Sequence, residues 1–303
     1  MTGIVGLHHV TAICGSPQEN VDFYVKTMGQ RLVKRTVNFD APGTYHLYYG
    51  DAAGSPGTIL TFFPFVDAGP GRAGPGMAEA VAYKVAPAGF DAAMERLALG
   101  AVDFEGPAER FGARILTLRD PDGMPVEIVE ADGAPEAAHA FHSVTLQLSD
   151  VEPTARLLSD IFGYRNVGEE ADGATTRLRL EAGGEGGSFV DLKRATAGAS
   201  GRQGAGTIHH VAFRARTNEE QLAWQEKVRA AGFEVTPVID RQYFNAIYFR
   251  EPGGVLFEIA TDPPGFAVDE APETLGEALK LPPQYEQHRQ RIEDILPPIK
   301  VPA

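Results

Sequence analysis

The sequence predicts an α+β protein made of four βαβββ units, in which a strand and a short helix are followed by two or three more strands. Two internal copies indicate this repetition. The run His-His-Val-Thr that ends at Thr11 returns as His-Ser-Val-Thr in the second half, and Pro-Val-Glu-Ile around Glu127 returns as Leu-Phe-Glu-Ile around Glu258. Both copies lie about 130 residues downstream, so the two halves look like a duplication. One unit is too small to close a hydrophobic core, and we therefore expect the units to pair into two similar domains with curled, mixed sheets.

Each unit opens with an apolar, β-branched strand and continues into a short helix. In the first unit Ser16 is a suitable N-cap, Pro17 fits the first helical position, and Gly29 ends the helix. In the second unit Asp-Pro-Asp-Gly at 120–123 separates two apolar runs, which is a strong hairpin signal. The expected strands are 7–15, 31–39, 44–49, 58–65, 80–86, 114–119, 125–130, 142–148, 177–180, 189–192, 208–215, 246–250 and 255–260, and the expected helices are 17–28, 90–99, 152–162 and 219–231.

Loops rich in Gly, Pro or Ala separate the units, at 67–76, 131–138 and 195–206. We expect an N-terminal pair of units over 1–135, a C-terminal pair over 136–262, and a tail over 263–303. The tail contains an amphipathic pattern near 285–296 that predicts a helix. Its sequence leaves two interpretations open: a strap packed on the surface, or a lid or dimer contact.

Composition excludes several classes of protein. The chain has 303 residues and a formal net charge of −14, which would repel nucleic acid and anionic membranes. No apolar run approaches the roughly 20 residues that span a bilayer, and no secretory signal is visible at the N-terminus. The single cysteine, Cys14, excludes an internal disulfide and a thiolate zinc cluster. We expect a cytoplasmic protein that binds neither nucleic acid nor membrane; a homo-oligomer is left open.

Two imidazoles and one carboxylate stand inside apolar strands. His9 lies in the first strand of the first unit, His210 in the first strand of the fourth, and Glu258 between Phe and Ile in the last strand of the fourth. An unpaired buried carboxylate costs several kcal/mol, so Glu258 needs a cation or hydrogen-bond donors. Two histidines and one carboxylate suit a non-haem Fe(II) or Mn(II) ion with open coordination positions. We predict that these three residues are metal ligands around which the sheets curl.

The duplication provides an internal control for this prediction. The positions equivalent to the three ligands in the other copies are Ser143, Ala80 and Glu127. This second set cannot hold a transition metal tightly. One complete site and one degenerate site are what we expect when one copy of a duplicated site is lost.

Several motifs resemble those of a known family. They are Gly-Leu-His-His-Val-Thr at 6–11, Met-Gly-Gln-Arg-Leu-Val-Lys-Arg-Thr at 28–36, Tyr-His-Leu-Tyr-Tyr-Gly-Asp at 45–51, Ile-His-His-Val-Ala-Phe at 208–213, Pro-Gly-Gly-Val-Leu-Phe-Glu at 252–258 and Gly-Phe at 265–266. Together they resemble the vicinal oxygen chelate superfamily, which includes glyoxalase I, fosfomycin- and bleomycin-resistance proteins and extradiol dioxygenases. Within it, the chain is similar to the hydroquinone-type ring-cleaving dioxygenases, the group of dichlorohydroquinone dioxygenase.

The resemblance implies an Fe(II)-dependent dioxygenase that inserts O2 into a hydroquinone- or catechol-type aromatic diol. It implies metal ligation by the same three residues that the repeat singles out. It also implies catalytic roles for His8, His209, Tyr248 and Arg241, and substrate contacts from Thr11, Tyr248 and Arg241. Successive side chains of a strand point to opposite faces, so His8 and His209 should point away from the face that carries His9 and His210. This orientation also fits a role in the core or in support of the ligands.

Two other functions stay open at this point. A glyoxalase-like lyase or isomerase would need a fourth ligand, yet the strand expected over 58–65 offers threonines and no Glu or Gln. A metal-free binding protein of the bleomycin-resistance type would leave the buried Glu258 and its two histidines without a purpose. Tyr45, His46 and Tyr49 could line a pocket or form a cross-strand aromatic cluster. The sequence does not decide the ring substituents, para- against ortho-diols, iron against manganese, or which residue is the acid or base.

Overall fold

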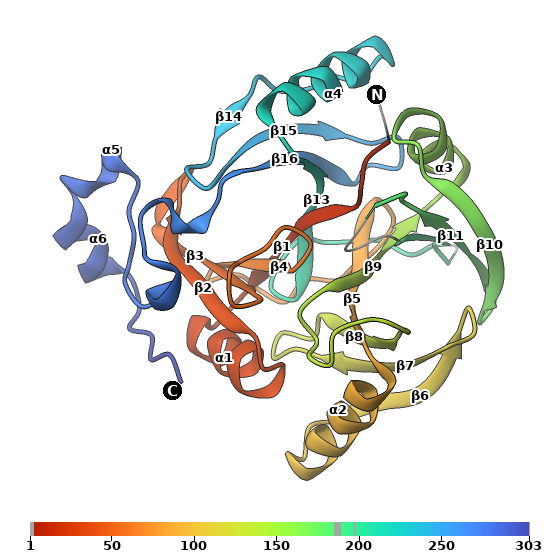
Figure 1. Ribbon diagram of the computed structural model, residues 1–303, viewed down its shortest axis with the longest axis horizontal. Coiled ribbons are helices and arrows are strands. Elements are labelled where there is room, and N and C mark those ends of the chain that lie inside the picture. The colour runs from red at the N-terminus through yellow and green to blue at the C-terminus, as the bar shows by residue number, and fades with distance from the viewer. Residues whose placement is uncertain (1–2, 185–188, 197, 303) are drawn as a thin grey trace.

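Two eight-stranded sheets form the body of the protein, and each curls into a half-barrel (Figure 1). The structure is a computed structural model and describes residues 3–184, 189–196 and 198–302. The first sheet has the order β14 (Ile239–Asp240), β15 (Phe244–Arg250), β16 (Leu256–Pro264), β13 (Thr207–Ala215), β1 (Leu7–Cys14), β4 (Ile59–Pro64), β3 (Ala41–Gly50), β2 (Arg31–Asn38). The second has the order β10 (Arg165–Asp172), β11 (Thr175–Glu181), β12 (Phe189–Arg194), β9 (Phe141–Leu148), β5 (Met77–Val85), β8 (Pro125–Glu130), β7 (Ala113–Arg119), β6 (Phe104–Arg110). The predicted α+β fold of four repeated units with mixed sheets is confirmed.

The first sheet joins the first unit to the fourth, and the second sheet joins the second unit to the third. At their centres β1 pairs antiparallel with β13, and β5 pairs antiparallel with β9. The first and second units, and the third and fourth, therefore lie in different sheets. The second and third units share a sheet and meet at its centre. Both sheets combine strands from before and after residue 135. The domain boundaries expected after residues 135 and 262 stay a proposal.

Three strands, β6, β10 and β14, lie where the sequence pattern does not indicate a strand. All three are edge strands. β6 is largely exposed and contains Gly106 and Pro107, two residues that weaken a central strand but are tolerated at an edge. These three edge strands lack an apolar pattern that would reveal them, because only part of their surface meets the core.

The helices of the four units are α1 (Pro17–Asp22), α2 (Pro87–Leu99), α3 (Glu152–Arg156) and α4 (Asn218–Ala230). The cap predicted at Ser16 is confirmed, because its Oγ accepts a hydrogen bond from the Glu19 amide at 3.3 Å. The helices of the first and third units are not uniform as predicted. Each continues into one π-helical turn, Phe23–Thr27 and Leu157–Ile161, so the duplication extends to this irregularity.

The C-terminal tail lies as a strap along β2, at the edge of the first sheet. Lys34 of β2 is fully buried, and its Nζ lies 2.7 Å from carboxylate oxygens of both Asp269 and Glu270. The helix predicted near 285–296 is two short helices, α5 (Pro283–Glu286) and α6 (Arg289–Ile295). In the described part of the chain, none of the helices has the length and apolar character needed to cross a membrane.

Candidate metal centre

Three neighbouring strands at the centre of the first sheet bring the predicted metal ligands together. His9 lies in β1, His210 in β13 and Glu258 in β16. Ala212 of β13 is the register partner of both His9 and Glu258, so the three candidates lie on nearly one line across the sheet. All three side chains are buried.

The donor atoms of these residues converge on one point. Nε2 of His210 lies 2.9 Å from Oε2 of Glu258, and Nε2 of His9 lies 3.3 Å from the same oxygen. The two Nε2 atoms are 3.4 Å apart. Residues that are 201 positions apart in the chain therefore meet within one small cluster.

Glu258 has no cation beside it in the part of the chain that the structure describes. Both carboxylate oxygens are buried and neither has a hydrogen-bond partner, because the short contacts to the imidazoles lack hydrogen-bond geometry. A carboxylate buried in this way is unstable without a compensating charge. The ligand atoms of the three residues lie within 4.8 Å of one another. Two imidazole nitrogens and one carboxylate oxygen fit a divalent ion such as Fe(II) or Mn(II).

Each candidate histidine ligand is supported by the histidine that precedes it. Nδ1 of His9 lies 2.9 Å from Nδ1 of His8, and Nδ1 of His210 lies 2.8 Å from Nδ1 of His209. A neutral imidazole has one donor and one acceptor nitrogen, so a ligand that binds through Nε2 donates through Nδ1. With a metal at the two Nε2 atoms, His8 and His209 would accept these bonds and orient the two ligands. The two histidines of each pair start from opposite faces of the strand, but the edges of their rings still meet.

Burial keeps three of the four histidines neutral. It lowers the pKa of His8 to about 3 and that of His209 to about 4, and it also lowers the pKa of His210. Burial alone would raise the pKa of Glu258, but the adjacent imidazoles of His9 and His210 outweigh it and hold this pKa below its usual value. Neutral imidazoles and an ionised carboxylate are the protonation states that bind a metal ion.

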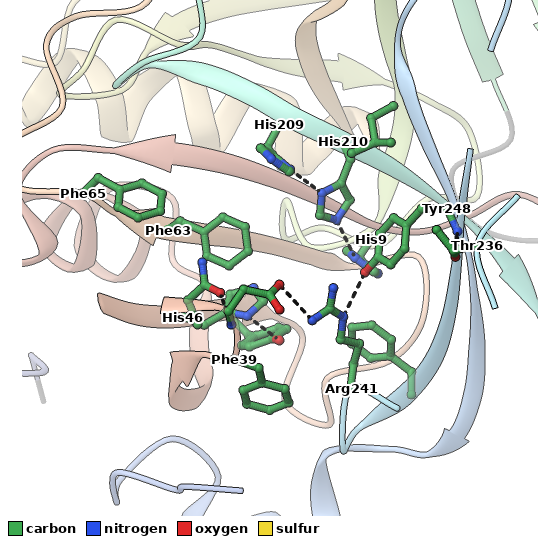
Figure 2. A pocket seen from close by; sticks show the side chains of 15 residues that line it. His9, Phe39, His46, Phe63, Phe65, His209, His210, Thr236, Arg241 and Tyr248 are labelled. Carbon is green, nitrogen blue, oxygen red and sulfur yellow. Dashed lines mark hydrogen bonds and ion pairs between the residues drawn. The ribbon is translucent and has the colours of Figure 1, made fainter. Parts of the chain in front are cut away.

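A cavity of about 380 Å³ opens beside the cluster (Figure 2). His9 and His210 form part of its wall. Its apolar lining consists largely of aromatic rings, those of Phe39, Phe63, Phe65 and Phe244. Its polar lining includes His46, Tyr48, His209, Arg241 and Tyr248. A mostly apolar cavity with a few convergent polar groups suits a small aromatic ligand.

Arg241 and Tyr248, both predicted to act on the substrate, lie together on one side of this cavity (Figure 2). Nε of Arg241 donates to Tyr248 Oη at 3.2 Å, and Nη1 lies 3.2 Å from Oδ2 of Asp40. Tyr248 is the register partner of Glu258 across β15 and β16. Burial raises the pKa of Tyr248 well above its usual value, so its hydroxyl stays protonated. The pair can therefore donate hydrogen bonds to an oxygen in the cavity.

Thr11 differs from the other predicted residues. It is fully buried, and it is absent from the described residues that line the cavity. Its hydroxyl accepts a hydrogen bond from Thr61 Oγ1 at 2.9 Å. Thr61 in turn bonds His46, so Thr11 reaches the cavity through two other side chains. The predicted direct contact with substrate stays a prediction.

The alternation of side chains along β3 shows which of its aromatic residues face the cavity. His46 and Tyr48 share the face of β3 that lines the cavity, whereas Tyr45 and Tyr49 point to the opposite face. Tyr49 packs in the core, and its hydroxyl donates to Asn20 Oδ1 at 2.9 Å. The sequence indicated His46 but missed Tyr48. Residues two positions apart on a strand share a face, so the position of His46 would have indicated Tyr48.

Comparison with known proteins identifies the family. Residues 6–128 and 140–259 match the Glyoxalase/Bleomycin resistance protein/Dioxygenase superfamily. The chain belongs to this superfamily. The two matched segments correspond to the two halves of the duplication. Two full-length relatives of the chain are dioxygenases by name.

MhqO of Bacillus subtilis strain 168, provisionally named a ring-cleaving dioxygenase, is 48% identical over 310 residues, covering 98% of this chain and 97% of that protein. The chlorohydroquinone/hydroquinone 1,2-dioxygenase of Sphingobium indicum is 37% identical over 303 residues, covering 93% of each chain. A crystal structure from Bacillus subtilis, provisionally described as a dioxygenase, superposes with a TM-score of 0.94 at 46% identity, covering 100% of this chain and 99% of the other.

Proposed function

We propose that this protein is a metal-dependent ring-cleaving dioxygenase that acts on a hydroquinone- or catechol-type aromatic diol with O2. The observation that carries the proposal is the buried, unpaired carboxylate of Glu258 beside Nε2 of His9 and His210. These three residues would hold the metal, and the dioxygenase names of the full-length relatives support the reaction class. We propose Fe(II) as the metal, with Mn(II) as the alternative that the same ligands accept.

The metal would supply the redox chemistry, since three protein ligands leave open positions for a substrate oxygen and for O2. The protein's own residues orient the diol and control its protons. The aromatic rings of Phe39, Phe63 and Phe65 form the apolar part of the cavity and would hold the substrate ring away from water.

Arg241 and Tyr248 would stabilise charge that develops on a substrate oxygen. Both point into the cavity, and their mutual hydrogen bond fixes the direction of the guanidinium. A preorganised donor pair in a mostly apolar cavity is effective, because it does not need to reorient as charge develops.

The two supporting histidines would have different roles. His209 lines the cavity, so it can contact the substrate and is our candidate for the acid or base. His8 is buried and is not among the described cavity residues, and its ring packs against Phe244 at a centroid distance of 5.3 Å. We assign His8 the role of orienting His9.

The proposed reaction is tested by O2 uptake after anaerobic reconstitution with Fe(II) and, separately, with Mn(II). We expect O2 uptake that matches the loss of aromatic absorbance when hydroquinone or catechol is added. His210→Ala and Glu258→Ala should abolish the uptake. Ser143→Ala, which changes the position equivalent to His9 in the second sheet, should leave it unchanged.

Two results would overturn the proposal. A protein that retains the metal but consumes no O2 with either diol would point to a lyase or isomerase of the same superfamily. A protein that retains no divalent metal would point to a binding protein. In the described part of the chain, no fourth His, Cys, Asp or Glu joins the cluster, which is an observation against the lyase.

A further inference from the structure

A chain of hydrogen bonds runs along the cavity wall on the side of β3, and the proposed chemistry does not use it. We infer that Tyr48, oriented by His46, accepts a hydrogen bond from the substrate hydroxyl that is remote from the metal, and that it thereby favours para-diols over ortho-diols. This inference rests on the proposed function and makes the substrate class of the same cavity more specific.

The chain consists of four side chains on three adjacent strands. Tyr48 Oη lies 2.8 Å from His46 Nδ1, and His46 Nε2 lies 2.8 Å from Thr61 Oγ1. Thr61 Oγ1 donates to Thr11 Oγ1 at 2.9 Å. The chain therefore begins at a cavity residue and ends in the core of the sheet, on the strand that carries His9.

The hydrogen bond from Thr61 to Thr11 determines which atom donates in each of the other bonds. Because the Thr61 hydroxyl donates to Thr11, its oxygen accepts from Nε2 of His46. Burial lowers the pKa of His46 well below its usual value, so the ring is neutral and its other nitrogen, Nδ1, is an acceptor. The hydrogen of Tyr48 is thus donated to His46. Tyr48 keeps its oxygen lone pair for the cavity and presents an acceptor, not a donor.

Tyr48 lies nearer the edge of the sheet than the metal ligands, on β3. The order of strands is β16, β13, β1, β4, β3, so β3 is two strands from His9 and further from His210 and Glu258. Two strand spacings are about 10 Å along the sheet. The curl of the sheet turns this wall toward the cavity, and Figure 2 shows His46 beside Phe63, across from Arg241 and Tyr248.

Most other polar groups of the wall are already engaged. Arg241 bonds Tyr248 and Asp40, and the Thr236 hydroxyl accepts from the Tyr248 amide at 3.0 Å. His209 is bonded to His210. Asn38 and Asp40 also line the cavity, and their side-chain oxygens hold the Asp40 amide and Arg241. On the β3 wall, Tyr48 keeps an oxygen lone pair that none of the described residues uses.

The two classes of diol differ in where they present their second hydroxyl. A para-diol with one oxygen at the metal directs the other hydroxyl away from it, across the ring. An ortho-diol keeps both oxygens at the same end. Only the para-diol can therefore place a donor at Tyr48 while it is held at the metal.

The ring of Tyr48 is fixed independently of its hydroxyl. It packs against Phe266 of the C-terminal strap at a centroid distance of 5.1 Å and against Tyr243 at 6.2 Å. Tyr48→Phe should therefore keep the wall in place and remove only the hydrogen-bond acceptor. Tyr45→Phe, on the opposite face of the same strand, is the matched control.

The inference is tested by anaerobic calorimetric titration of the metal-loaded protein with hydroquinone, catechol and 4-methoxyphenol. The last compound keeps one hydroxyl, but its remote oxygen cannot donate. The wild type should bind hydroquinone about 3- to 10-fold more tightly than 4-methoxyphenol, as one neutral hydrogen bond allows. Tyr48→Phe should lose this preference and leave the affinity for catechol unchanged, whereas Tyr45→Phe should keep both values.

A second variant tests the direction of the chain. In His46→Leu the hydrogen of Tyr48 is released and can donate to the ether oxygen, so the affinity for 4-methoxyphenol should rise toward that for hydroquinone. A preference for hydroquinone that survives in both variants would overturn the inference, as would an equal loss of catechol and hydroquinone binding in Tyr48→Phe. These binding measurements do not need turnover. Failure of the wild type to consume O2 would contradict the proposed reaction while the binding ratios still decide the role of Tyr48.

Discussion

The two sheets bury a glutamate at the same place in the repeat but balance its charge differently. In the second sheet Glu127 accepts two hydrogen bonds from Arg110, at 2.7 and 3.0 Å, so a guanidinium from the edge strand β6 occupies the space beside the carboxylate. In the first sheet the described residues place no lysine or arginine at Glu258, and its neighbours are the imidazoles of His9 and His210. The second sheet carries its own cation, whereas the first needs one from solution.

The lining of the second half-barrel supports this contrast. Arg179 forms a two-pronged pair with Asp191 at 2.7 and 2.8 Å, and its guanidinium lies over the rings of Phe111 and Phe189. Arginine side chains therefore fill the interior that stays open as a cavity in the first sheet. Of the two duplicated sheets, the first therefore carries the candidate active site and the second has an interior filled by ion pairs.

The largest effect should come from exchanging the carboxylates for amides. Glu258→Gln removes the negative charge that the metal neutralises, and we expect metal content to fall from about one ion per chain to background. Glu127→Gln should retain the metal. Elemental analysis after dialysis against buffer checks both variants, and equal loss of metal in the two would contradict the comparison.

Removing the internal cation should unfold the second sheet more easily. Arg110→Met leaves Glu127 buried without a partner, which should lower the free energy of unfolding by about 3–5 kcal/mol. Urea denaturation measures this change. The double variant Arg110→Met/Glu127→Leu should recover most of the loss, because it removes the stranded charge; a double variant as unstable as the single one would show that the arginine matters for packing alone.

A pH-dependent stability should arise from the hairpin turn of the second sheet. Burial, with a smaller contribution from Asp122, raises the pKa of Asp120 to about 6. The unfolded value is about 3.9, so the folded state binds the proton more tightly. This contribution to stability is present below pH 4 and is lost as pH rises through 6, a decrease of about 3 kcal/mol. In Asp120→Asn the unfolding free energy, measured in urea from pH 4 to 7, should lack this decrease. The metal content at pH 7 should stay the same.

The smallest effect should come from the supporting histidines. His8→Leu removes the acceptor for Nδ1 of His9, and we expect metal affinity to fall by about 10- to 100-fold. His142 stands at the equivalent place in the second sheet, where its Nδ1 lies 3.0 Å from Ser143 Oγ. His142→Leu should therefore leave metal affinity unchanged. Competition with a chelator of known affinity measures both.

The sequence predicted the fold and the candidate ligands because both follow from local pattern. The strands β1 and β13 and the buried position of Glu258 could be predicted from apolar runs, and the repeat showed which copy of the site was complete. The structure brings His9, His210 and Glu258 together as that reading requires, although their metal-binding role stays a prediction.

What the sequence did not indicate depends on contacts between distant strands. Arg110 lies in an exposed edge strand with no apolar pattern, so neither β6 nor its ion pair with Glu127 could be predicted. Tyr48 was missed because its neighbours are also aromatic, and only the face of β3 that turns toward the cavity separates it from Tyr49. Thr11 shares the face of His9, but Thr61 and His46 separate it from the cavity.

The pairing of β1 with β13 has a consequence for biosynthesis. The candidate ligands come from residue 9 and from residues 210 and 258, so a nascent chain cannot assemble the centre until its last unit has left the ribosome. Before that point a translating chain would expose His9 without its partners and could not hold a metal ion between all three residues. A bound ion would then join the two ends of the finished chain, and loss of the ion would loosen the junction between the first unit and the last.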